Sequence, residues 1–399
     1  MSAKRKKIKE HQLNGFKYFK AISEILEELH DAGCQRDLAG NRKLHMDQYI
    51  SLILLFMFNP ICSSLRALQQ ASELKKVQRI LGVPRASLGS LSEAARVFDS
   101  ELMEQVVEKL AAKLGPVSKN SKLSDLDGII TLVDGSLINT LSKMTWACWK
   151  SDQNAVRIHT QFDLQKYVPI KMTVTEGRGK GKSNEKEVLA DNLEPGRIYV
   201  KDRGYASLAL FQQILDQNSS FVCRIRDDSK YDILKEHELT QDALNAGIVF
   251  DREVRLGGDA KTQSKLSVPV RMVAIKCKPR KKRYNSDFNG PEQGETILVV
   301  TNKVDLDADV IGLIFQNRWA IEIFFRFFKH ILGCRHLLSH CQNGIELQTY
   351  AAIIACMLIS LWTGRKPTLR TYEMLCWYFT GMADFEELTN HIARLQKYD

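Results

Sequence analysis

The stretch that decides the fold begins with GIITLVDG at residues 128–135 and continues with AVRIHTQFDL at 155–164 and YVPIKMTVTEG at 167–177. Each segment is short and rich in β-branched residues, and turn-forming residues separate it from the next. The three segments therefore predict three consecutive strands.

Two further strands follow, each preceded by a helical segment. SNEKEVLADNL at 183–193 leads into RIYVKD at 197–202, and SLALFQQILDQ at 207–217 leads into FVCRIR at 221–226. Strands that are joined through a helix usually pair in parallel within one sheet. The order predicts an α/β fold in which the fourth and fifth strands are parallel neighbours.

The regions on either side of these strands have different patterns. Residues 1–125 show only helical periodicity, a polar and strand-rich segment spans about 227–296, and a long helix is expected at about 306–332. Two more helices are expected at about 346–363 and 370–396. We therefore divide the chain into a helical N-terminal region (1–125), a core (126–345) with a β-rich insertion (227–296), and a helical C-terminal region (346–399).

The composition limits the class of protein. The chain has 399 residues, with 57 Lys and Arg against 47 Asp and Glu, so its formal net charge is +10. Its 44% of hydrophobic residues is typical of a globular protein and excludes a collagenous chain or an acidic tail protein. The basic excess suits a polyanionic partner, although it also serves ordinary solubility.

Cysteine usage and apolar runs indicate the compartment. The nine cysteines include no C-x-x-C pair, which favours a reducing, intracellular setting. The charged N-terminal segment MSAKRKKIKE lacks the apolar stretch of a signal peptide. The apolar runs at 49–58 and 350–362 are shorter than the ~20 residues of a membrane-spanning helix, so we expect two buried core helices and a soluble, cytoplasmic protein.

Two aspartates mark the ends of predicted strands. Asp134 ends the first strand in TLVDGS, and Asp202 ends the fourth in IYVKDRGY. Carboxylates at the C-terminal ends of neighbouring strands converge on one crevice of an open α/β sheet. Taken alone, both residues also suit ordinary turns.

The predicted long helix carries a file of charges along one edge. In FQNRWAIEIFFRFFKHIL (315–332), Phe315, Arg318, Glu322 and Lys329 fall within about 60° of one another at roughly 100° per residue. The alternative is a solvated Arg318–Glu322 pair, which stabilises a helix by only about 0.2–0.5 kcal/mol. That alternative does not explain why so apolar a helix holds its charges in one file.

Together the three acids predict a metal site. Asp134, Asp202 and Glu322 would form a hard, oxygen-rich site that prefers Mg²⁺ or Mn²⁺ over zinc. Two such ions, about 3.5–4 Å apart, serve phosphodiester cleavage. Arg318 and Lys329 would hold phosphates beside them.

These motifs resemble the insertion-sequence-four family of DDE transposases, whose signature is Tyr-x2-Arg-x3-Glu-x6-Lys. Phe315, Arg318, Glu322 and Lys329 carry that spacing, VDGS at 133–136 is similar to the family's first aspartate motif, and KDRGY at 201–205 is similar to its second. The resemblance covers about 126–345 and extends more loosely to the N-terminal helical region.

The resemblance implies a ribonuclease-H-like catalytic core with a β-rich insertion, and an N-terminal region that binds DNA. It implies cut-and-paste transposition, in which element ends are nicked hydrolytically and the freed 3′-OH attacks target DNA. It also implies two Mg²⁺ (or Mn²⁺) ions on Asp134, Asp202 and Glu322, DNA ends and target DNA as partners, and a homodimer that bridges two ends. A cytoplasmic, nucleoid-associated location follows, and Arg203 and Tyr205 are further candidates for DNA contact.

Two departures from the family pattern stand out. Phe315 replaces the signature tyrosine, which removes a hydroxyl but preserves stacking. The insertion holds no tryptophan to stack a flipped base in a hairpin intermediate, and Tyr284 or Phe288 would have to replace it. A non-catalytic DNA-binding relative, or a structure-selective nuclease without strand transfer, therefore remain alternatives.

Several other motifs have less specific interpretations. GRGKGKS at 177–183 is not a P-loop, because residue 176, five before Gly181, is a glutamate, and we interpret it as a basic turn able to touch the DNA backbone. The basic runs at 4–9 and 278–283 are candidate phosphate contacts. His159 is expected to be a hydrogen-bonded histidine within the sheet.

Overall fold

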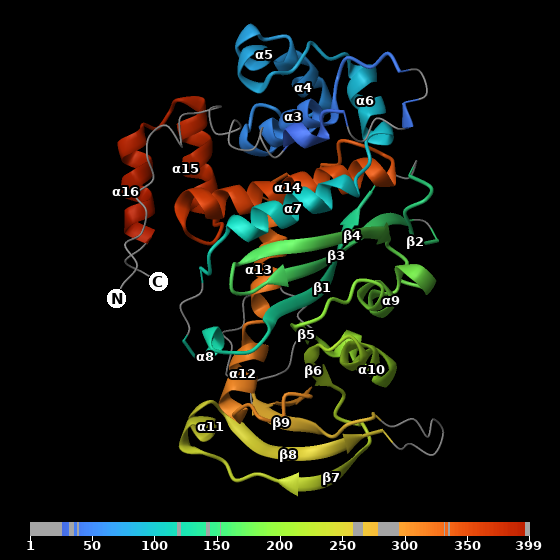
Figure 1. Ribbon diagram of the computed structural model, residues 1–399, viewed down its shortest axis with the longest axis vertical. Helices are drawn as coiled ribbons and strands as arrows, with labels where there is room; N and C mark the ends of the chain where they lie inside the picture. The colour runs from blue at the N-terminus through green and yellow to red at the C-terminus, as the bar shows by residue number, and fades with distance from the viewer. Residues whose placement is uncertain are drawn as a thin grey trace.

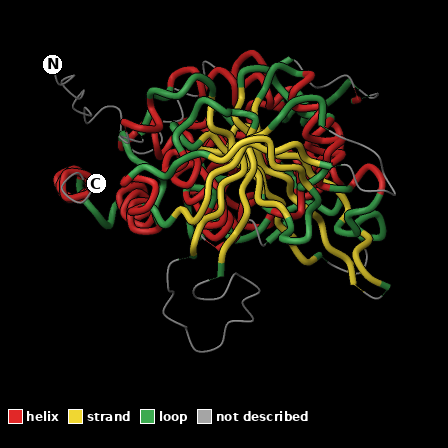
Figure 2. The backbone as a smooth tube through the Cα atoms, turned by 90° about the horizontal axis from the view of Figure 1, so that it is seen from below, coloured by secondary structure: helices red, strands yellow, loops and turns green. Residues whose placement is uncertain are grey.

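One twisted, mixed sheet of ten strands runs through the protein; helices pack on its faces and gather at one end of the molecule, whereas strands lie at the other end (Figures 1 and 2). The strand order is β2-β3-β1-β5-β6-β10-β9-β8-β7, with β4 paired to β3 outside this path. The computed structural model describes residues 26–31, 36–37, 40–117, 121–140, 144–151, 153–257, 266–277, 295–330, 332–333 and 336–395.

The five strands predicted from the sequence form one half of this sheet. β1 (Ile129–Asn139) pairs antiparallel with β3 (Gln153–Asp163), and β3 pairs antiparallel with β4 (Val168–Glu176). On its other side β1 pairs in parallel with β5 (Arg197–Lys201), and β5 in parallel with β6 (Ser220–Ile225). The predicted parallel pairing of the fourth and fifth strands is confirmed, as is the mixed α/β class.

The other half of the sheet is built from later segments. β10 (Thr296–Thr301) pairs antiparallel with β6, and the sheet continues through β9 (Val270–Lys276) and β8 (Ile248–Leu256) to the edge strand β7 (Tyr231–Glu236). The strands of the segment 227–296 therefore extend the main sheet. Two short elements complete this description: β2 (Cys148–Lys150), which the sequence pattern does not predict, and α11 (Gln241–Asn245).

Alternation along the strands assigns each residue to one of two faces. Ile130 and Leu132 of β1 belong to the larger apolar core, together with helices α13 (Trp319–His330) and α14 (Gln342–Thr363). Val133 belongs to the core on the opposite face, under α9 (Glu185–Ala190) and α10 (Leu208–Asp216). Because side chains alternate with period two, even-numbered positions of β1 face α13 and odd-numbered positions face α9.

Helices of the N-terminal and C-terminal regions pack around α14. The remaining helices are η1 (Glu27–Leu29), α3 (Met46–Phe58), α4 (Leu65–Ser72), α5 (Lys75–Leu81), α6 (Leu88–Val97), α7 (Leu102–Lys113), α8 (Ser121–Ser124), α12 (Ala308–Gln316), α15 (Leu369–Thr380) and α16 (Phe385–Leu395). By length and composition α14 could cross a membrane, but 89% of its most apolar window is buried inside the protein. The expectation that this run and α3 are core helices is confirmed.

Two helices expected to be continuous are broken. The predicted helix at 306–332 is α12 followed by α13, because the Asn317 amide donates to the Leu313 carbonyl and the next backbone bonds have the tighter three-residue spacing, as from Arg318 N–H to Phe315 O. The predicted helix at 370–396 is divided into α15 and α16. The first of these, α15, ends at Gly381, whose φ of 80° lies in the left-handed region.

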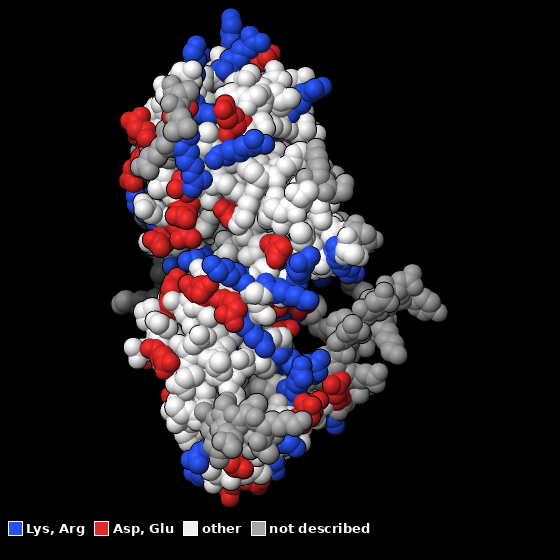
Figure 3. All heavy atoms as spheres, turned by 90° about the vertical axis from the view of Figure 1, so that its right-hand side faces the viewer, with Lys and Arg blue, Asp and Glu red and all other residues white. Residues whose placement is uncertain are grey.

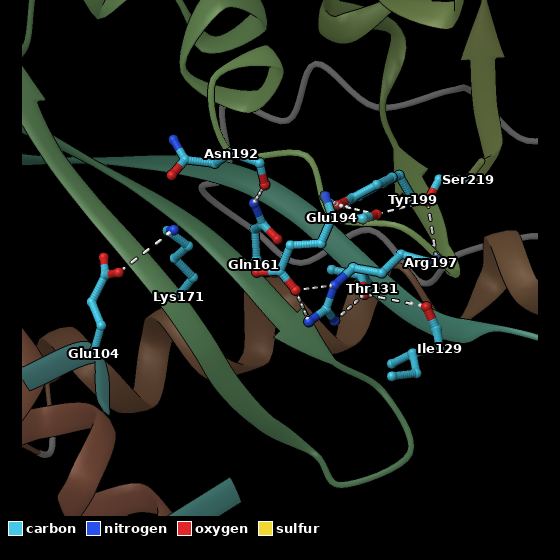
Figure 4. A network of polar contacts seen from close by, with 10 residues as sticks. All are labelled: Glu104, Ile129, Thr131, Gln161, Lys171, Asn192, Glu194, Arg197, Tyr199 and Ser219. Carbon is cyan, nitrogen blue, oxygen red and sulfur yellow. Dashed lines mark hydrogen bonds and ion pairs between the residues drawn. The ribbon is translucent and has the colours of Figure 1, made fainter. Parts of the chain in front are cut away.

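A polar network fixes the alignment of β5 with β1 (Figure 4). The Arg197 guanidinium, at the start of β5, donates to Glu194 Oε2 at 2.8 Å and to Thr131 Oγ1 of β1 at 3.1 Å. Ser219 donates to the Glu194 carbonyl and accepts from the Arg197 backbone N–H. These bonds tie the turn before β5 to its neighbours on both sides, so the register of β5 is set at its first residue.

Candidate active site

The register of the parallel strands brings two acids level with each other. Ile129 pairs with Arg197 and Leu132 with Val200, a constant offset of 68 residues, so two residues further on Asp134 lies level with Asp202. Adjacent strands lie about 4.8 Å apart. Both aspartates are at even positions, and Leu132 and Val200 belong to the core that contains α13, so both aspartates face that helix.

The position of Asp134 within its strand differs from the prediction. β1 continues to Asn139 because its pairing with β3 extends through that residue, so Asp134 lies in the middle of the strand. Only the pairing with β5 stops before it. Asp202 does follow the last residue of β5, as predicted, and its Oδ1 accepts the Gly204 N–H at 2.8 Å.

Arg318, just before α13, lies near Asp134, and Glu322 lies one turn further along on α13. Arg318 donates to Glu322 Oε1 at 2.8 Å, and both side chains are partly buried. Further along α13, the Lys329 ammonium donates at 2.7 Å to the Leu137 carbonyl of β1. The helix therefore follows β1 past Asp134, and Lys329 holds the strand there. Phe315, on α12, has the Arg318 guanidinium 6.0 Å from its ring centroid.

The electrostatics of Asp134 reflect burial and the charges of Arg318 and Asp202. Burial raises the pKa of Asp134 to about 7; Arg318 opposes this rise, whereas the neighbouring Asp202 carboxylate adds to it. A buried carboxylate next to another acid favours the neutral form unless positive charge is supplied. The charge of Arg318 therefore does not offset the effects of burial and of Asp202 on the Asp134 carboxyl.

A fourth acid, which sequence reasoning missed, approaches from the other face of the sheet. Glu185, at the start of α9, forms an ion pair with Arg157 of β3. Its Oε1 lies so near the strand that a Cβ atom on Gly135 would be 2.6 Å away. Gly135 is thus required for close approach rather than for a turn. The local sequence gives no signal for this contact, because it joins segments 50 residues apart.

The two further candidates in the second aspartate motif have different environments. Arg203 is exposed, as a DNA contact requires. Tyr205 is 1% exposed, and burial and the acids Glu185, Asp134 and Asp202 raise the pKa of its phenol. Its hydroxyl has no hydrogen-bond partner. A side chain buried in this way does not contact DNA directly, so the interpretation of Tyr205 as a DNA contact is not supported.

Other motifs have the following positions. His159 accepts or donates one hydrogen bond, between Nε2 and Thr175 Oγ1 at 2.9 Å, but its buried Nδ1 has no partner, so the expected hydrogen-bonded sheet histidine is only half satisfied. The basic turn at 177–183 contains the short helix η3 (Gly181–Ser183) beside α9. Tyr284, Phe288 and the basic runs at 4–9 and 278–283 lie outside the described residues.

The donor set fits hard divalent cations. Within the part of the chain that the structure describes, the one group of three metal-binding side chains with all ligand atoms within 4.8 Å is His30, Asp31 and His45. The rings of His30 and His45 are stacked at 3.8 Å and 9°, so an ion could not lie in both ring planes without rotating them. The carboxylate oxygens of Asp134, Asp202 and Glu322 do not all lie within 4.8 Å of one another, and these side chains offer only oxygen donors.

A comparison with protein families decides what kind of site this is. The model of the transposase DDE domain matches residues 125–358, which contain all three acids and both strands. The chain belongs to the DDE transposase family. The resemblance found in the motifs is therefore confirmed at the level of the family.

Named relatives agree with this assignment. The chain is 24% identical over 234 residues to a putative transposase, y4zB, of Sinorhizobium fredii, covering 58% of this chain and 60% of that protein. It is 22% identical to a probable transposase for insertion sequence element IS5377 of Geobacillus stearothermophilus, covering 80% of each chain. It is also 22% identical to a putative transposase for element IS4SA of Synechocystis, covering 69% of this chain and 71% of the relative.

A solved structure is also similar to the chain. The piggyBac transposase synaptic complex with hairpin DNA aligns with 98% of this chain and 87% of that chain, at 12% identity and a TM-score of 0.43. A score of this size supports no argument about detail. The family match and the insertion-sequence relatives together identify the chain as an insertion-sequence DDE transposase that acts on DNA.

Proposed function

We propose that this transposase catalyses cut-and-paste transposition with Asp134, Asp202 and Glu322 as its catalytic acids. The observation that supports this most is the register that aligns Asp134 with Asp202, together with Arg318, which interacts with Asp134 and donates to Glu322. In the first step, a water oxygen attacks phosphorus at the element end and the P–O3′ bond breaks, which leaves a 3′-OH and a 5′-phosphate. In the second step, that 3′-oxygen attacks a target phosphate and displaces a target 3′-oxygen.

The three acids would hold two Mg²⁺ or Mn²⁺ ions. Such ions activate the attacking oxygen and stabilise the leaving oxygen. The raised pKa of Asp134 supports this assignment, since a bound cation would favour the ionised carboxylate that burial and Asp202 disfavour. We assign no zinc, because the donors are all carboxylates.

The other residues have positioning roles in this proposal. Arg318 donates to Glu322 and interacts with Asp134, and its guanidinium would hold a phosphate oxygen of the cut strand. The ring of Phe315 lies 6.0 Å from that guanidinium and would support it. Lys329 keeps α13 against β1 at Leu137 and supplies positive charge to the same edge. Arg203, exposed beside Asp202, is the DNA contact that remains from the second motif.

The roles that we propose for the different regions of the chain follow the family resemblance. We propose that residues 126–345 are a ribonuclease-H-like catalytic domain with the insertion at 227–296, because β4-β3-β1-β5-β6 runs from three antiparallel strands to two parallel ones. Residues 1–125 would bind the terminal inverted repeats, and 346–399 would support the core. We further propose a homodimer that bridges two ends, in the cytoplasm at the nucleoid.

The proposal is tested by cleavage of the element's own terminal repeats. The wild type and Glu322→Gln are incubated with end-labelled repeats and Mg²⁺, and binding is measured separately by gel shift. We expect equal binding and cleavage by the wild type alone. Equal binding with no cleavage by either protein would indicate a DNA-binding relative that has lost catalysis, and cleavage without joining to target DNA would indicate a nuclease.

A further inference from the structure

The basic turn at 177–183 is exposed at one side of the sheet. The side chains of Arg178, Lys180 and Lys182 are all exposed and alternate with glycines. Lys186 follows on α9, so residues 178–187 carry four basic and two acidic side chains, a net charge of 4 − 2 = +2. The face of the molecule on which α9 lies shows Lys and Arg gathered in a band across its middle (Figure 3).

A chain of contacts connects this turn to the catalytic acids. A Cβ atom on Gly179 would lie 3.5 Å from an Arg157 guanidinium nitrogen. Arg157 forms the ion pair with Glu185, and Glu185 lies against Gly135, the residue after Asp134. The turn is therefore close to the site, on the face of the sheet opposite α13.

The shape of the turn is set internally. Gly179 and Gly181 have φ of 68° and 56°, which favours glycine at both positions. The buried Ser183 hydroxyl donates to the Lys180 carbonyl at 2.7 Å and accepts the Lys180 N–H at 3.1 Å. The N–H groups of Ser183 and Asn184 bond to carbonyls of the same turn. Three backbone donors of the turn are thus used within it, and the exposed basic side chains are available to bind an anion.

We propose that the turn at 177–183 is a phosphate clamp that holds the DNA backbone on the α9 face of the sheet, through Lys180 and Lys182. The choice of DNA as the ligand rests on the proposed function. A preformed turn with flexible ammonium groups suits contact with successive phosphates without reading sequence. Clamped phosphates would hold the duplex against the α9 face, while Asp134 and Asp202 face α13 on the other side of the sheet.

The test measures salt dependence rather than cleavage. Binding of the full chain to a fluorescein-labelled 30-base-pair duplex is followed by anisotropy at NaCl concentrations from 50 to 200 mM. Each lost phosphate contact lowers the slope of log K against log[NaCl] by about 0.9. For Lys180→Ala/Lys182→Ala we therefore expect the slope of log K against log[NaCl] to be smaller in magnitude by about 1.8 than for the wild type. Between 50 and 200 mM NaCl the variant should then lose affinity by a factor about ten times smaller than the wild type does.

Matched controls exclude a general effect of charge or folding. Lys230→Ala/Lys235→Ala removes two exposed lysines, one just before β7 and one on it, and is expected to leave the slope unchanged. Lys180→Arg/Lys182→Arg keeps both charges and should restore it. As a second measurement, methylphosphonates flanking the cleaved phosphate should weaken binding by the wild type and not by the alanine variant.

The outcomes separate the clamp from the proposed catalysis. An alanine variant with the wild-type slope, or an equal drop in the Lys230/Lys235 control, would overturn the clamp while leaving cleavage by the wild type intact. A smaller slope in a protein that fails to cut its element ends would support the clamp and refute the catalytic proposal.

Discussion

Replacing Asp134 by Asn should stabilise the cation-free protein at alkaline pH. The folded-state pKa of Asp134 is about 7, whereas its ordinary value is 3.8. Between these two values the folded chain binds a proton that the unfolded chain does not, so this carboxyl stabilises the folded state below its folded pKa and that contribution is lost as pH rises through 7. From pH 5 to pH 8 the loss is about 2–3 kcal/mol.

The asparagine variant lacks this titration. We therefore expect its free energy of unfolding, measured by urea denaturation in EDTA, to exceed that of the wild type by about 2–3 kcal/mol more at pH 8 than at pH 5. Adding Mg²⁺ at pH 8 should stabilise the wild type and not the variant. A difference that stays constant with pH would refute the reasoning that Asp134 is buried beside Asp202 without a compensating charge.

Three more predictions concern the neighbouring structure. Burial lowers the pKa of His159 from 6.5 to about 4, so the wild type should lose about 2 kcal/mol of stability between pH 7.5 and 5, and His159→Gln should abolish that part of the acid sensitivity in urea titrations. Gly135→Ala places a Cβ 2.6 Å from Glu185 Oε1, the flexible end of that side chain, so it should displace the carboxylate from Arg157 and cost only about 0.2–1 kcal/mol by thermal denaturation; Gly135→Ala should add no loss in a Glu185→Ala background. Arg197→Met removes bonds to Glu194 and Thr131 and should cost about 1–3 kcal/mol in the same assay, with exposed Lys235→Met as an unaffected control.

The sequence predicts the sheet well where the signal is local. β-Branched runs predict β1, β3, β4, β5 and β6, and the intervening helices predict which neighbours are parallel. The sequence does not predict that Asp134 lies within β1, because the length of a strand depends on its partner, and β3 pairs with β1 five residues beyond it.

Long-range features of the site are invisible in the sequence. Helical periodicity places Arg318 and Glu322 on one edge correctly, since they are one turn apart, but it misses the break at Asn317, where one side-chain bond to Leu313 interrupts the helix. Glu185 arrives from the opposite face of the sheet, and no periodic pattern relates it to Gly135. Motif spacing identifies the acids, whereas the residues that support them depend on tertiary packing.

The burial of Tyr205 has a similar origin. Its position in KDRGY suggests a loop residue available to DNA, but the tight turn η4 (Arg203–Tyr205) that Asp202 caps directs its ring into the core under α10. Arg203, two residues earlier, stays exposed. Adjacent residues of one motif therefore differ in what they can contact.

The most direct test that Asp134, Asp202 and Glu322 together form one cation-binding centre is iron-directed cleavage of the protein. Fe²⁺ replaces Mg²⁺ in the full chain, ascorbate and peroxide are added, and the fragments are mapped by mass spectrometry. We predict backbone cuts clustered near all three acids, suppressed by excess Mg²⁺ and lost in Asp134→Asn. Cuts confined to the neighbourhood of His30 and His45, or cuts near the acids that persist in Asp134→Asn, would contradict this account.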